Sequence, residues 1–562
     1  MRFLFTMLLF IPIMGSAQTL AATDGLGRVL PQQKEVGAPK ANKHVALFYF
    51  LWQGDSPTSE KYWDLTEMWQ RDSSVFNDFN HPGWGGGAGV AGKYYFWGQP
   101  IYGYYQGGDY WVHLKNVQLL TDAGVDILIL DATNRLTYLK QTDALMRALE
   151  TVRKQGRKTP KVVFYTNTKS GETMQELYDS CYKVGAPYRY PENWFYLEGK
   201  PLIIGISKEA RNSFFTIRES QWPTEAFKNN AWPWIEFQRL QHVYLNNKGE
   251  REIVNVSTAQ HPVVPMGHSA FYKRPGNWGR SYRNGAEGNA ADLPYGYNIQ
   301  EQWEFALKQD VPFIFITGWN EWIAGKWRYK KSKDTAVFVD QASPEYSRDI
   351  EPSLTAGLED HYYMQMVSNI RRYKGYGAIP LLGPEKSIKG WGDWVHVLPV
   401  YRDYTGDVLH RKYPGAQSEP KVIYENTTGR NDLSVMKVAR DKQYVYFYAS
   451  TVAAITPNTG KNWMTLWLDM DRSGKYDYRI VGGDQLQFNK DGTWSDLAKV
   501  AYRMKGKELM ISIPLSRIGI KSNNINFEFK WSDNMQEDNP LDWYVNGDAA
   551  PGGRFNFVVT NK

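Results

Sequence analysis

The sequence predicts two folded units in order, a (β/α)8 barrel and then an antiparallel β-sandwich. Three observations support this: short apolar runs alternate with helical patterns over residues 44–375, a Gly- and Pro-bearing linker covers 376–390, and the pattern changes to a two-residue period over 391–562. Continuous apolar runs are typical of parallel strands that are covered on both faces. Strands that alternate with helices are typical of a barrel. The 562 residues are enough for both units.

The first unit is expected to contain eight strands with helices between several of them. The expected strands are Val45–Trp52, Val125–Asp131, Lys161–Asn167, Pro201–Ile206, Ser213–Glu219, Trp232–Phe237, Glu252–Gln260 and Val311–Trp322. Apolar residues recur every third position from Trp111 to Leu120, which predicts a helix that Gly124 stops. Asn298 and Glu301 form a capping-box-like start for a later helix.

The second unit is predicted from strands of alternating pattern separated by turns. These strands are Tyr444–Tyr448, Trp463–Leu468 and Leu509–Ile513. Between two of them, Asp469, Asp471 and Ser473 place oxygen atoms at alternate positions before Gly474, as calcium loops do. Ile480 stands where such a loop needs a bidentate Glu, so a plain turn is the alternative. No other metal site and no other cofactor is predicted.

The N-terminus reads as a secretory signal peptide. Arg2 precedes an apolar stretch from Phe3 to Met14, and small residues end at Ala17. We therefore expect cleavage after Ala17, a secreted or periplasmic protein, and an N-terminal extension over 18–43. The apolar stretch is too short to cross a bilayer. With Cys181 as the only cysteine, stability must come from a large core instead of from disulfides.

Composition favours a carbohydrate partner and argues against nucleic acid. Aromatic residues make up 15% of the chain, with 22 Trp and 37 Tyr. Rings with one apolar and one polar end suit sugar surfaces. The net charge is 66 − 59 = +7 and forms no basic run, so nucleic acid binding is not predicted. No later segment is apolar and long enough to predict insertion into a membrane.

Carboxylates at the predicted strand ends are the candidate catalytic residues. Active sites of barrels lie at the C-terminal ends of the strands. Glu321 follows the eighth strand, between two tryptophans, and Asp131 and Glu236 end the second and sixth strands. Because glycosidases use two carboxyl groups, we predict Glu321 as one and Asp131 or Glu236 as the other. There are alternatives for these residues. Asp131 could cap a helix or pair with an arginine, and Glu236 or Glu219 could be a loop residue.

Aromatic and polar residues at the same strand ends are the candidate substrate-binding residues. The predicted sugar platform consists of Trp52, Trp278, Trp319 and Trp322. The residues predicted to hold sugar hydroxyls are Asn167, His261, Arg280 and Asn320. The long loop after the seventh strand supplies two of these, and loops of such length are uncommon unless they serve a function.

The segment Gly318–Gly325 resembles the Asn-Glu-Trp signature of glycoside hydrolase families 71 and 99, which include endo-α-mannosidases and WbsX-like proteins. Val45–Phe50 also resembles their first strand. The resemblance implies a (β/α)8 fold and action on glycosides. Glu321 matches the family's first Glu, whereas Ala324 stands at the position of the second. Either another carboxylate has taken over, or activity has been lost. Leu466–Asp471 is similar to carbohydrate-binding module family 9.

The sequence thus favours a secreted glycoside hydrolase that acts on a poly- or oligosaccharide by carboxylate acid/base catalysis. Two alternatives remain open. One is a non-catalytic polysaccharide-binding protein, which would need no second carboxylate. The other is a lyase or hydrolase that acts on anionic glycans, which Arg274, Arg280 and Arg283 would suit.

Overall fold

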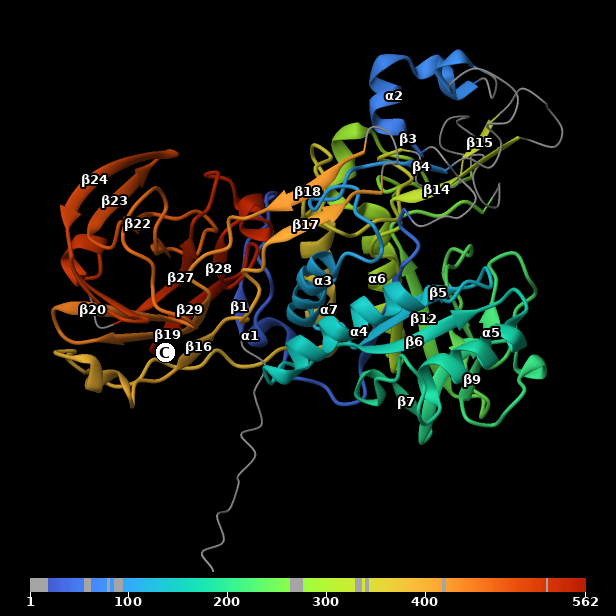
Figure 1. Ribbon diagram of the computed structural model, residues 1–562, viewed down its shortest axis with the longest axis horizontal. Coiled ribbons are helices and arrows are strands. Elements are labelled where there is room, and N and C mark those ends of the chain that lie inside the picture. The colour runs from blue at the N-terminus through green and yellow to red at the C-terminus, as the bar shows by residue number, and fades with distance from the viewer. Residues whose placement is uncertain are drawn as a thin grey trace, which may run out of the picture.

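The structure is a computed structural model, and it has two parts (Figure 1). It describes residues 19–54, 62–77, 81–84, 94–262, 276–328, 336–338, 343–416, 421–521 and 524–562. The expected signal peptide and Arg274 lie outside the described residues. Among the residues described, no helix has the length and apolar character needed to span a membrane. We call residues 44–374 the barrel-like part and residues 400–562 the all-β part.

A large, mostly parallel sheet forms the centre of the barrel-like part. A strand forms at each of the eight predicted places, and all eight run parallel. In spatial order they are β10 (Ala231–Pro233), β9 (Thr216–Gln221), β8 (Lys200–Gly205), β6 (Lys161–Thr166), β5 (Ile127–Ala132), β2 (His44–Tyr49), β13 (Phe313–Thr317) and β12 (Arg251–Ser257).

Two short antiparallel strands complete this sheet. They are β11 (Tyr244–Leu245), which pairs with β12, and β7 (Tyr196–Leu197), which pairs with β8. Asn230, just before β10, donates its backbone N–H to the carbonyl of Leu245 on β11 at 3.0 Å. The two ends of the sheet therefore lie together, and the sheet is a nearly closed, barrel-like structure.

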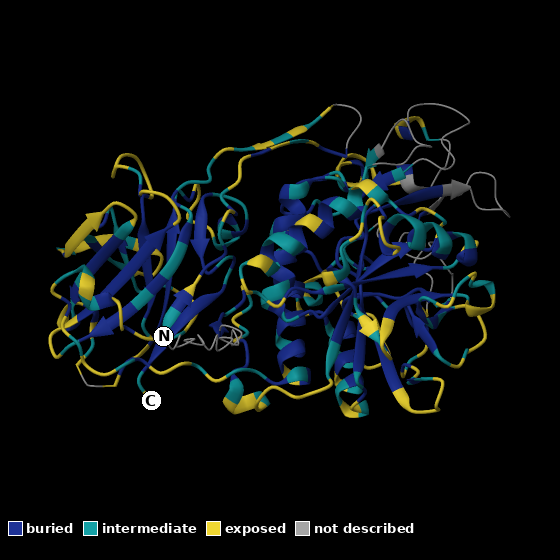
Figure 2. Cartoon of the chain, turned by 60° about the horizontal axis from the view of Figure 1, so that its bottom comes forward, coloured by how far each residue is buried: buried dark blue, intermediate teal, exposed yellow. Residues whose placement is uncertain are grey.

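Alternate residues of the strands face two different cores. On β2, Ala46 and Phe48 belong to an inner cluster that includes Phe315 of β13. Val45 and Leu47 belong to an outer cluster that includes residues of the covering helices. Because both faces are covered, the strands are apolar throughout, as parallel strands usually are. Figure 2 shows these strands as almost uniformly buried.

Helices cover part of the outside of the sheet. They are α3 (Tyr110–Ala123), α4 (Leu139–Lys154), α5 (Ser170–Leu177), α6 (Tyr297–Gln309) and α7 (His361–Lys374). The predicted stop of α3 is confirmed, because Gly124 adopts φ 83° and returns its N–H to the last turn. Among the described residues, no α-helix connects β8 to β9 or β9 to β10; the 3₁₀ turn η5 (Ser207–Glu209) lies in the first of these connections.

The predicted capping box of α6 is wrong. The helix begins at Tyr297 after Gly296, and no side chain caps it. Asn298 instead donates its side-chain N–H to the carbonyl of Thr258 at 2.9 Å and to the side chain of Gln260 at 2.8 Å. Its amide thus holds the segment after β12, a long-range contact that local sequence does not encode.

A small four-stranded sheet lies beyond the C-terminal end of β13. Its order is β15 (Ala336–Phe338), β14 (Ile323–Arg328), β4 (Tyr94–Phe96) and β3 (Tyr62–Asp64), with α2 (Leu65–Arg71) directly after β3. β14 follows Glu321 and Trp322, so the predicted eighth strand runs straight into this second sheet.

The all-β part contains two larger sheets whose pairings are all antiparallel. One has the order β1 (Leu20–Ala21), β29 (Asn556–Thr560), β27 (Asn526–Asp533), β21 (Thr465–Asp469), β22 (Tyr478–Val481), β23 (Gln485–Lys490) and β24 (Thr493–Lys499), with β28 (Asp548–Ala550) on β27. The other has the order β16 (Val400–Arg402), β19 (Leu433–Arg440), β20 (Tyr444–Thr451), β26 (Glu508–Pro514) and β25 (Ala501–Lys505). Their faces meet where the rings of Phe447 and Phe529 lie 5.7 Å apart.

Three predicted strands of this part form as β20, β21 and β26. The N-terminal segment, which also holds α1 (Gln33–Val36), adds a strand that sequence reasoning did not foresee, because Leu20 on β1 pairs with Phe557 on β29. The hairpin of β17 (Arg411–Pro414) and β18 (Ile423–Asn426) forms a separate two-stranded sheet.

Buried polar contacts join the two parts. Arg411 on β17 forms an ion pair with Asp109, the N-cap of α3, at 2.8 Å. Asp360, just before α7, accepts hydrogen bonds from Tyr544 Oη at 2.8 Å and from Arg554 Nε at 2.5 Å. The all-β part therefore docks on α3 and on the start of α7, which lie toward it in Figure 1.

Candidate active site

The predicted site residues follow the C-terminal ends of parallel strands. Asp131 lies at the end of β5, Asn167 follows β6, and Glu321 follows β13. The register aligns these ends, since Ala132 on β5 pairs with Thr166 on β6. Ends of parallel strands meet at one rim, so the topology brings these side chains to the same end of the sheet.

Glu321 forms a buried, two-pronged ion pair with Arg348. Nε of Arg348 lies 2.8 Å from Oε2 of Glu321, and Nη2 lies 2.6 Å from Oε1. The side chains are 9% and 1% exposed, respectively. The backbone fixes Arg348 here, because its carbonyl accepts the N–H of Gly318 at 3.2 Å. Such bidentate pairing holds the carboxylate in one orientation.

Sequence reasoning missed Arg348 as a site residue. It lies 27 positions after Glu321, in a segment without a strand or a helical pattern. Its guanidinium also stacks over the ring of Trp234, 5.3 Å from the ring centroid. Only the three-dimensional path of the chain brings these residues together, so no local signal could have identified it.

Asp131 has a buried environment that favours proton donation. It is 8% exposed, and its Oδ1 accepts the backbone N–H of Thr133 at 2.9 Å. Burial raises its pKa to about 6, and the negative charge of Glu321 adds to that rise. Asp131 and Glu321 therefore lie close enough for their charges to interact. Such an arrangement gives two acids different roles in catalysis.

Aromatic side chains border this pair of carboxyl groups. Trp52 is half-buried, and its ring lies 5.5 Å from that of Tyr94. Burial raises the pKa of Tyr138, and the nearby charge of Asp131 raises it further. Burial also raises the pKa of Tyr95, which interacts with the charges of Glu321 and Arg348. Rings of this kind at a carboxyl pair suit the C–H faces of a sugar.

Glu236 is engaged by neighbouring donors on both of its oxygens. Oε1 accepts the N–H of Gln238 at 2.8 Å, while Oε2 accepts Tyr244 Oη at 3.1 Å and lies 2.9 Å from Nδ1 of His242. These contacts hold the loop between β10 and β11. Glu219, on β9, accepts the backbone N–H of Ser207 at 3.2 Å.

Three residues of the strand-eight motif are fully buried. Trp319 and Trp322 are 0% exposed; the ring of Trp319 packs on Tyr363, and that of Trp322 on Tyr105. Asn320 accepts the N–H of Phe50 at 2.8 Å and donates to its carbonyl at 3.1 Å. In this structure the three side chains brace the end of β2 against the end of β13.

The remaining predicted hydroxyl-binding and platform residues differ in exposure. Asn167 and Trp278 are half-buried, and Asn167 accepts the hydroxyl of Ser220 at 2.8 Å. Arg280 is buried and donates Nε to the carbonyl of Ser347 at 2.8 Å. His261 is fully buried, and burial lowers its pKa well below the usual value, so the ring is neutral.

Ala324 occupies an apolar environment. It lies on β14 opposite Tyr95, and it is 3% exposed. Its neighbours form a hydrophobic cluster that includes Leu65, Met68, Trp84, Tyr95, Trp97 and Phe338. A carboxylate at this position would be buried among these apolar side chains, which explains why an alanine fits it.

Two further acids near Glu321 were not predicted. Burial raises the pKa of Asp349 well above its usual value, and its Oδ1 is buried with no hydrogen-bond partner among the described residues. Glu321 is also among the causes of that rise, so Asp349 lies close to it. Glu351 is buried and accepts Tyr105 Oη at 2.9 Å and Asn116 Nδ2 at 3.3 Å.

The predicted calcium loop forms a turn after β21. Asp469 accepts the N–H of Ser473 at 3.1 Å and of Gly474 at 2.7 Å. A carboxylate oxygen of each of Asp469, Asp471 and Asp477 lies within 4.8 Å of the others. Three carboxylates are therefore close together here, and backbone N–H groups already use oxygens of Asp469.

Comparisons with known proteins find likenesses only among solved structures. No family model and no curated protein sequence matches the chain. Two structures of the GH99 endo-alpha-mannosidase from Bacteroides thetaiotaomicron, one in complex with Bis-Tris propane, are each 13% identical. Each likeness covers 59% of this chain and 97% of that one, with TM-scores of 0.33 and 0.34. A "glycoside hydrolase-like protein" is 11% identical over 61% of this chain and 96% of its own, with a TM-score of 0.30. At these values the likenesses assign neither a family nor an activity.

Proposed function

We propose that the protein is a secreted glycoside hydrolase in which Asp131 and Glu321 are the catalytic carboxyl groups. The observation that carries the proposal is the contrast between the two environments. Glu321 forms a two-pronged ion pair with Arg348, whereas burial and the charge of Glu321 raise the pKa of Asp131 to about 6. Two neighbouring carboxyl groups in such different environments suit acid-assisted glycoside cleavage.

The roles follow from these environments. Protonated Asp131 donates its proton to the glycosidic oxygen while the bond from that oxygen to the anomeric carbon breaks. The carboxylate of Glu321 stabilises the positive charge that develops on the sugar ring. From the sequence, Glu321 between two tryptophans is expected to donate the proton, with Asp131 or Glu236 as its partner. The ion pair with Arg348 argues against Glu321 as the proton donor.

We also propose the finer fold assignments as part of this account. The barrel-like part is a (β/α)8 barrel with some helices replaced by loops, and the all-β part is a β-sandwich that binds carbohydrate. The apolar segment at 1–17 directs export, followed by cleavage after Ala17. The ring-rich rim around Trp52 and Tyr94 supports a neutral poly- or oligosaccharide as substrate.

A non-catalytic polysaccharide-binding protein is the second candidate. The specific observation in its favour is that Arg348 contacts both oxygens of Glu321, which leaves that carboxylate less available for chemistry. Ala324 at the position of the family's second Glu points the same way.

The test is release of reducing ends from a panel of polysaccharides. We expect the wild type to release reducing ends from at least one substrate, and Glu321→Gln and Asp131→Asn each to lose about 10²–10⁴-fold in rate. Glu236→Gln, a carboxylate engaged by loop donors, is the matched control. Asp349→Asn tests the other acid near Glu321. Glycan binding without cleavage by the wild type would favour the binding protein, and a loss confined to Asp349→Asn would contradict Asp131 as the acid.

A further inference from the structure

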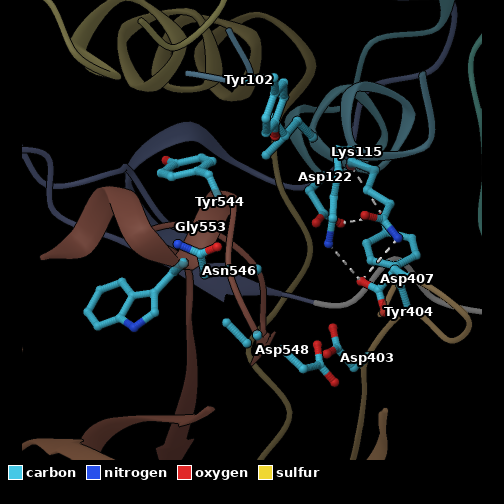
Figure 3. Close-up of a pocket in the computed structure, with 16 residues that line it drawn as sticks. Tyr102, Lys115, Asp122, Asp403, Tyr404, Asp407, Tyr544, Asn546, Asp548 and Gly553 are labelled. Carbon is cyan, nitrogen blue, oxygen red and sulfur yellow. Dashed lines mark hydrogen bonds and ion pairs between the residues drawn. The ribbon is translucent and has the colours of Figure 1, made fainter. Parts of the chain in front are cut away.

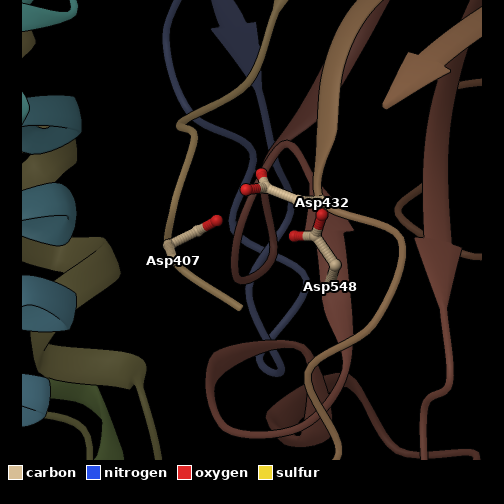
Figure 4. A group of neighbouring side chains, drawn as sticks. All are labelled: Asp407, Asp432 and Asp548. Atoms are coloured by element: carbon tan, nitrogen blue, oxygen red, sulfur yellow. The ribbon is translucent and has the colours of Figure 1, made fainter. Parts of the chain in front are cut away.

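A cluster of aspartates lies where the all-β part meets the barrel-like part, far along the chain from the candidate active site. Asp403 and Asp407 lie in the segment between β16 and β17, Asp432 precedes β19, and Asp548 begins β28. One carboxylate oxygen of each of Asp407, Asp432 and Asp548 lies within 4.8 Å of the others. Figure 4 shows these three carboxylates pointing toward a common centre.

Three of these carboxylates are buried, that of Asp432 is half-buried, and the cluster is incompletely bonded. Asp403 and Asp407 are each 7% exposed, and Asp548 is 3% exposed. Three carboxylate oxygens are buried and have no hydrogen-bond partner in the described part of the chain: Oδ2 of Asp403, Oδ1 of Asp407 and Oδ1 of Asp432. An unpartnered carboxylate oxygen inside a protein costs several kcal/mol unless it binds a proton or a cation.

The other oxygens of the cluster are fixed by donors that orient them. Asp432 accepts the N–H of Gly406 at 2.7 Å, and Asp548 accepts the N–H of Leu433 at 2.6 Å. Oδ2 of Asp407 accepts Nε2 of Gln118 at 3.3 Å. One oxygen of each of these carboxylates is thus held by the protein, so that the other is turned inward, as ligands of a bound ion are oriented by their neighbours.

Positive charge near the cluster does not match its negative charge. Nζ of Lys115 lies 3.7 Å from Asp407, and Figure 3 shows both at the edge of the cavity that Asp403 and Asp548 also line. Nζ of Lys530 donates to the carbonyls of Pro551 and Gly553, so it is already occupied. Arg157 and Asp122 also face Asp403, with opposite effects on its pKa.

We infer that Asp403, Asp407, Asp432 and Asp548 form a calcium site that fastens the all-β part to the barrel-like part. The donors are all oxygens, with no His or Cys among them, which selects a hard cation. Calcium accepts six to eight oxygen ligands in flexible geometry, so carboxylates from three separate segments suit it better than the strict octahedron of magnesium. The ion ties the segment after β16 to β28 and, through Gln118 and Lys115, to α3.

The direct test measures calcium binding to the full chain after removal of metal with EGTA. We expect isothermal titration to give binding in the wild type and a loss of at least about tenfold in affinity for Asp407→Asn and for Asp432→Asn, since each loses a charged ligand. Asp471→Asn, the same change in the aspartate group after β21, is the matched control and should keep this binding. Binding that disappears in Asp471→Asn but persists in Asp407→Asn would overturn the assignment.

A second measurement keeps the inference falsifiable if a variant folds poorly. Calcium should raise the melting temperature of the stripped wild-type protein by at least about 3 °C at concentrations far above the dissociation constant. Terbium should bind in its place and emit when tryptophan is excited, because Trp543 lines the same cavity. Excess calcium should quench that emission, and magnesium should not. An unchanged melting temperature together with absent emission would refute the site.

Discussion

Replacing Arg348 by methionine should destabilise the barrel-like part strongly, because it leaves Glu321 buried and unpaired. The pair makes two charge-assisted hydrogen bonds at 2.8 and 2.6 Å, and its side chains are only 9% and 1% exposed. Breaking one partner of such a pair costs about 3–5 kcal/mol, while methionine retains much of the packing on Trp234. The expected fall in melting temperature is roughly 4–7 °C for a part of this size.

Differential scanning calorimetry of three variants tests this reasoning. Adding Glu321→Gln to Arg348→Met should restore at least about half of the loss, because no charge is then stranded. Lys412→Met breaks the exposed pair with Glu425, whose side chains are 73% and 51% exposed, and should change stability by less than about 1 kcal/mol. The reasoning is refuted if Arg348→Met melts no lower than Lys412→Met, or if the double variant is the least stable.

Three further outcomes follow from the site. Activity should fall about tenfold per pH unit above about pH 6, because Asp131 must be protonated, and a rate that stays flat to pH 8 would rule it out as the acid. Ala324→Glu should lower the melting temperature without raising activity, since the new carboxylate is buried in an apolar cluster; a more active variant would contradict this. Asn320→Ala should cost about 1–3 kcal/mol by leaving the buried backbone groups of Phe50 unpaired, and a calorimetric loss below about 0.5 kcal/mol would show that water replaces the amide.

The sequence indicates the strands of this fold well because their physical signal is local. Each of the eight apolar runs becomes a strand, since burial on both faces demands an unbroken apolar pattern. Gly124 also ends its helix as expected, because a left-handed residue there depends only on its own backbone. The absent helices after β8 and β9 were not foreseen, because loops cover those connections without a periodic pattern.

Contacts between distant segments explain what sequence reasoning missed. Arg348, 27 residues beyond Glu321, orients the predicted catalytic carboxylate through an ion pair. Trp319 and Trp322 follow a strand end, where exposure is expected, yet distant rings cover them: Tyr363 of α7 packs on Trp319, and Tyr105 packs on Trp322. The aspartates at the junction span residues 403 to 548, so their proximity depends entirely on how the sheets pack.

The central claim is that Asp131 donates the proton and Glu321 stabilises the sugar cation. The most direct measurement compares the Asp131→Asn and Glu321→Gln variants on a natural glycan and on an aryl glycoside of the same sugar. An aryl leaving group departs without protonation, so Asp131→Asn should lose about 10²–10⁴-fold on the glycan but retain most of its rate on the aryl substrate. Glu321→Gln should be slow on both. Equal losses of Asp131→Asn on the two substrates, or near-full turnover by Glu321→Gln on either one, would contradict the account.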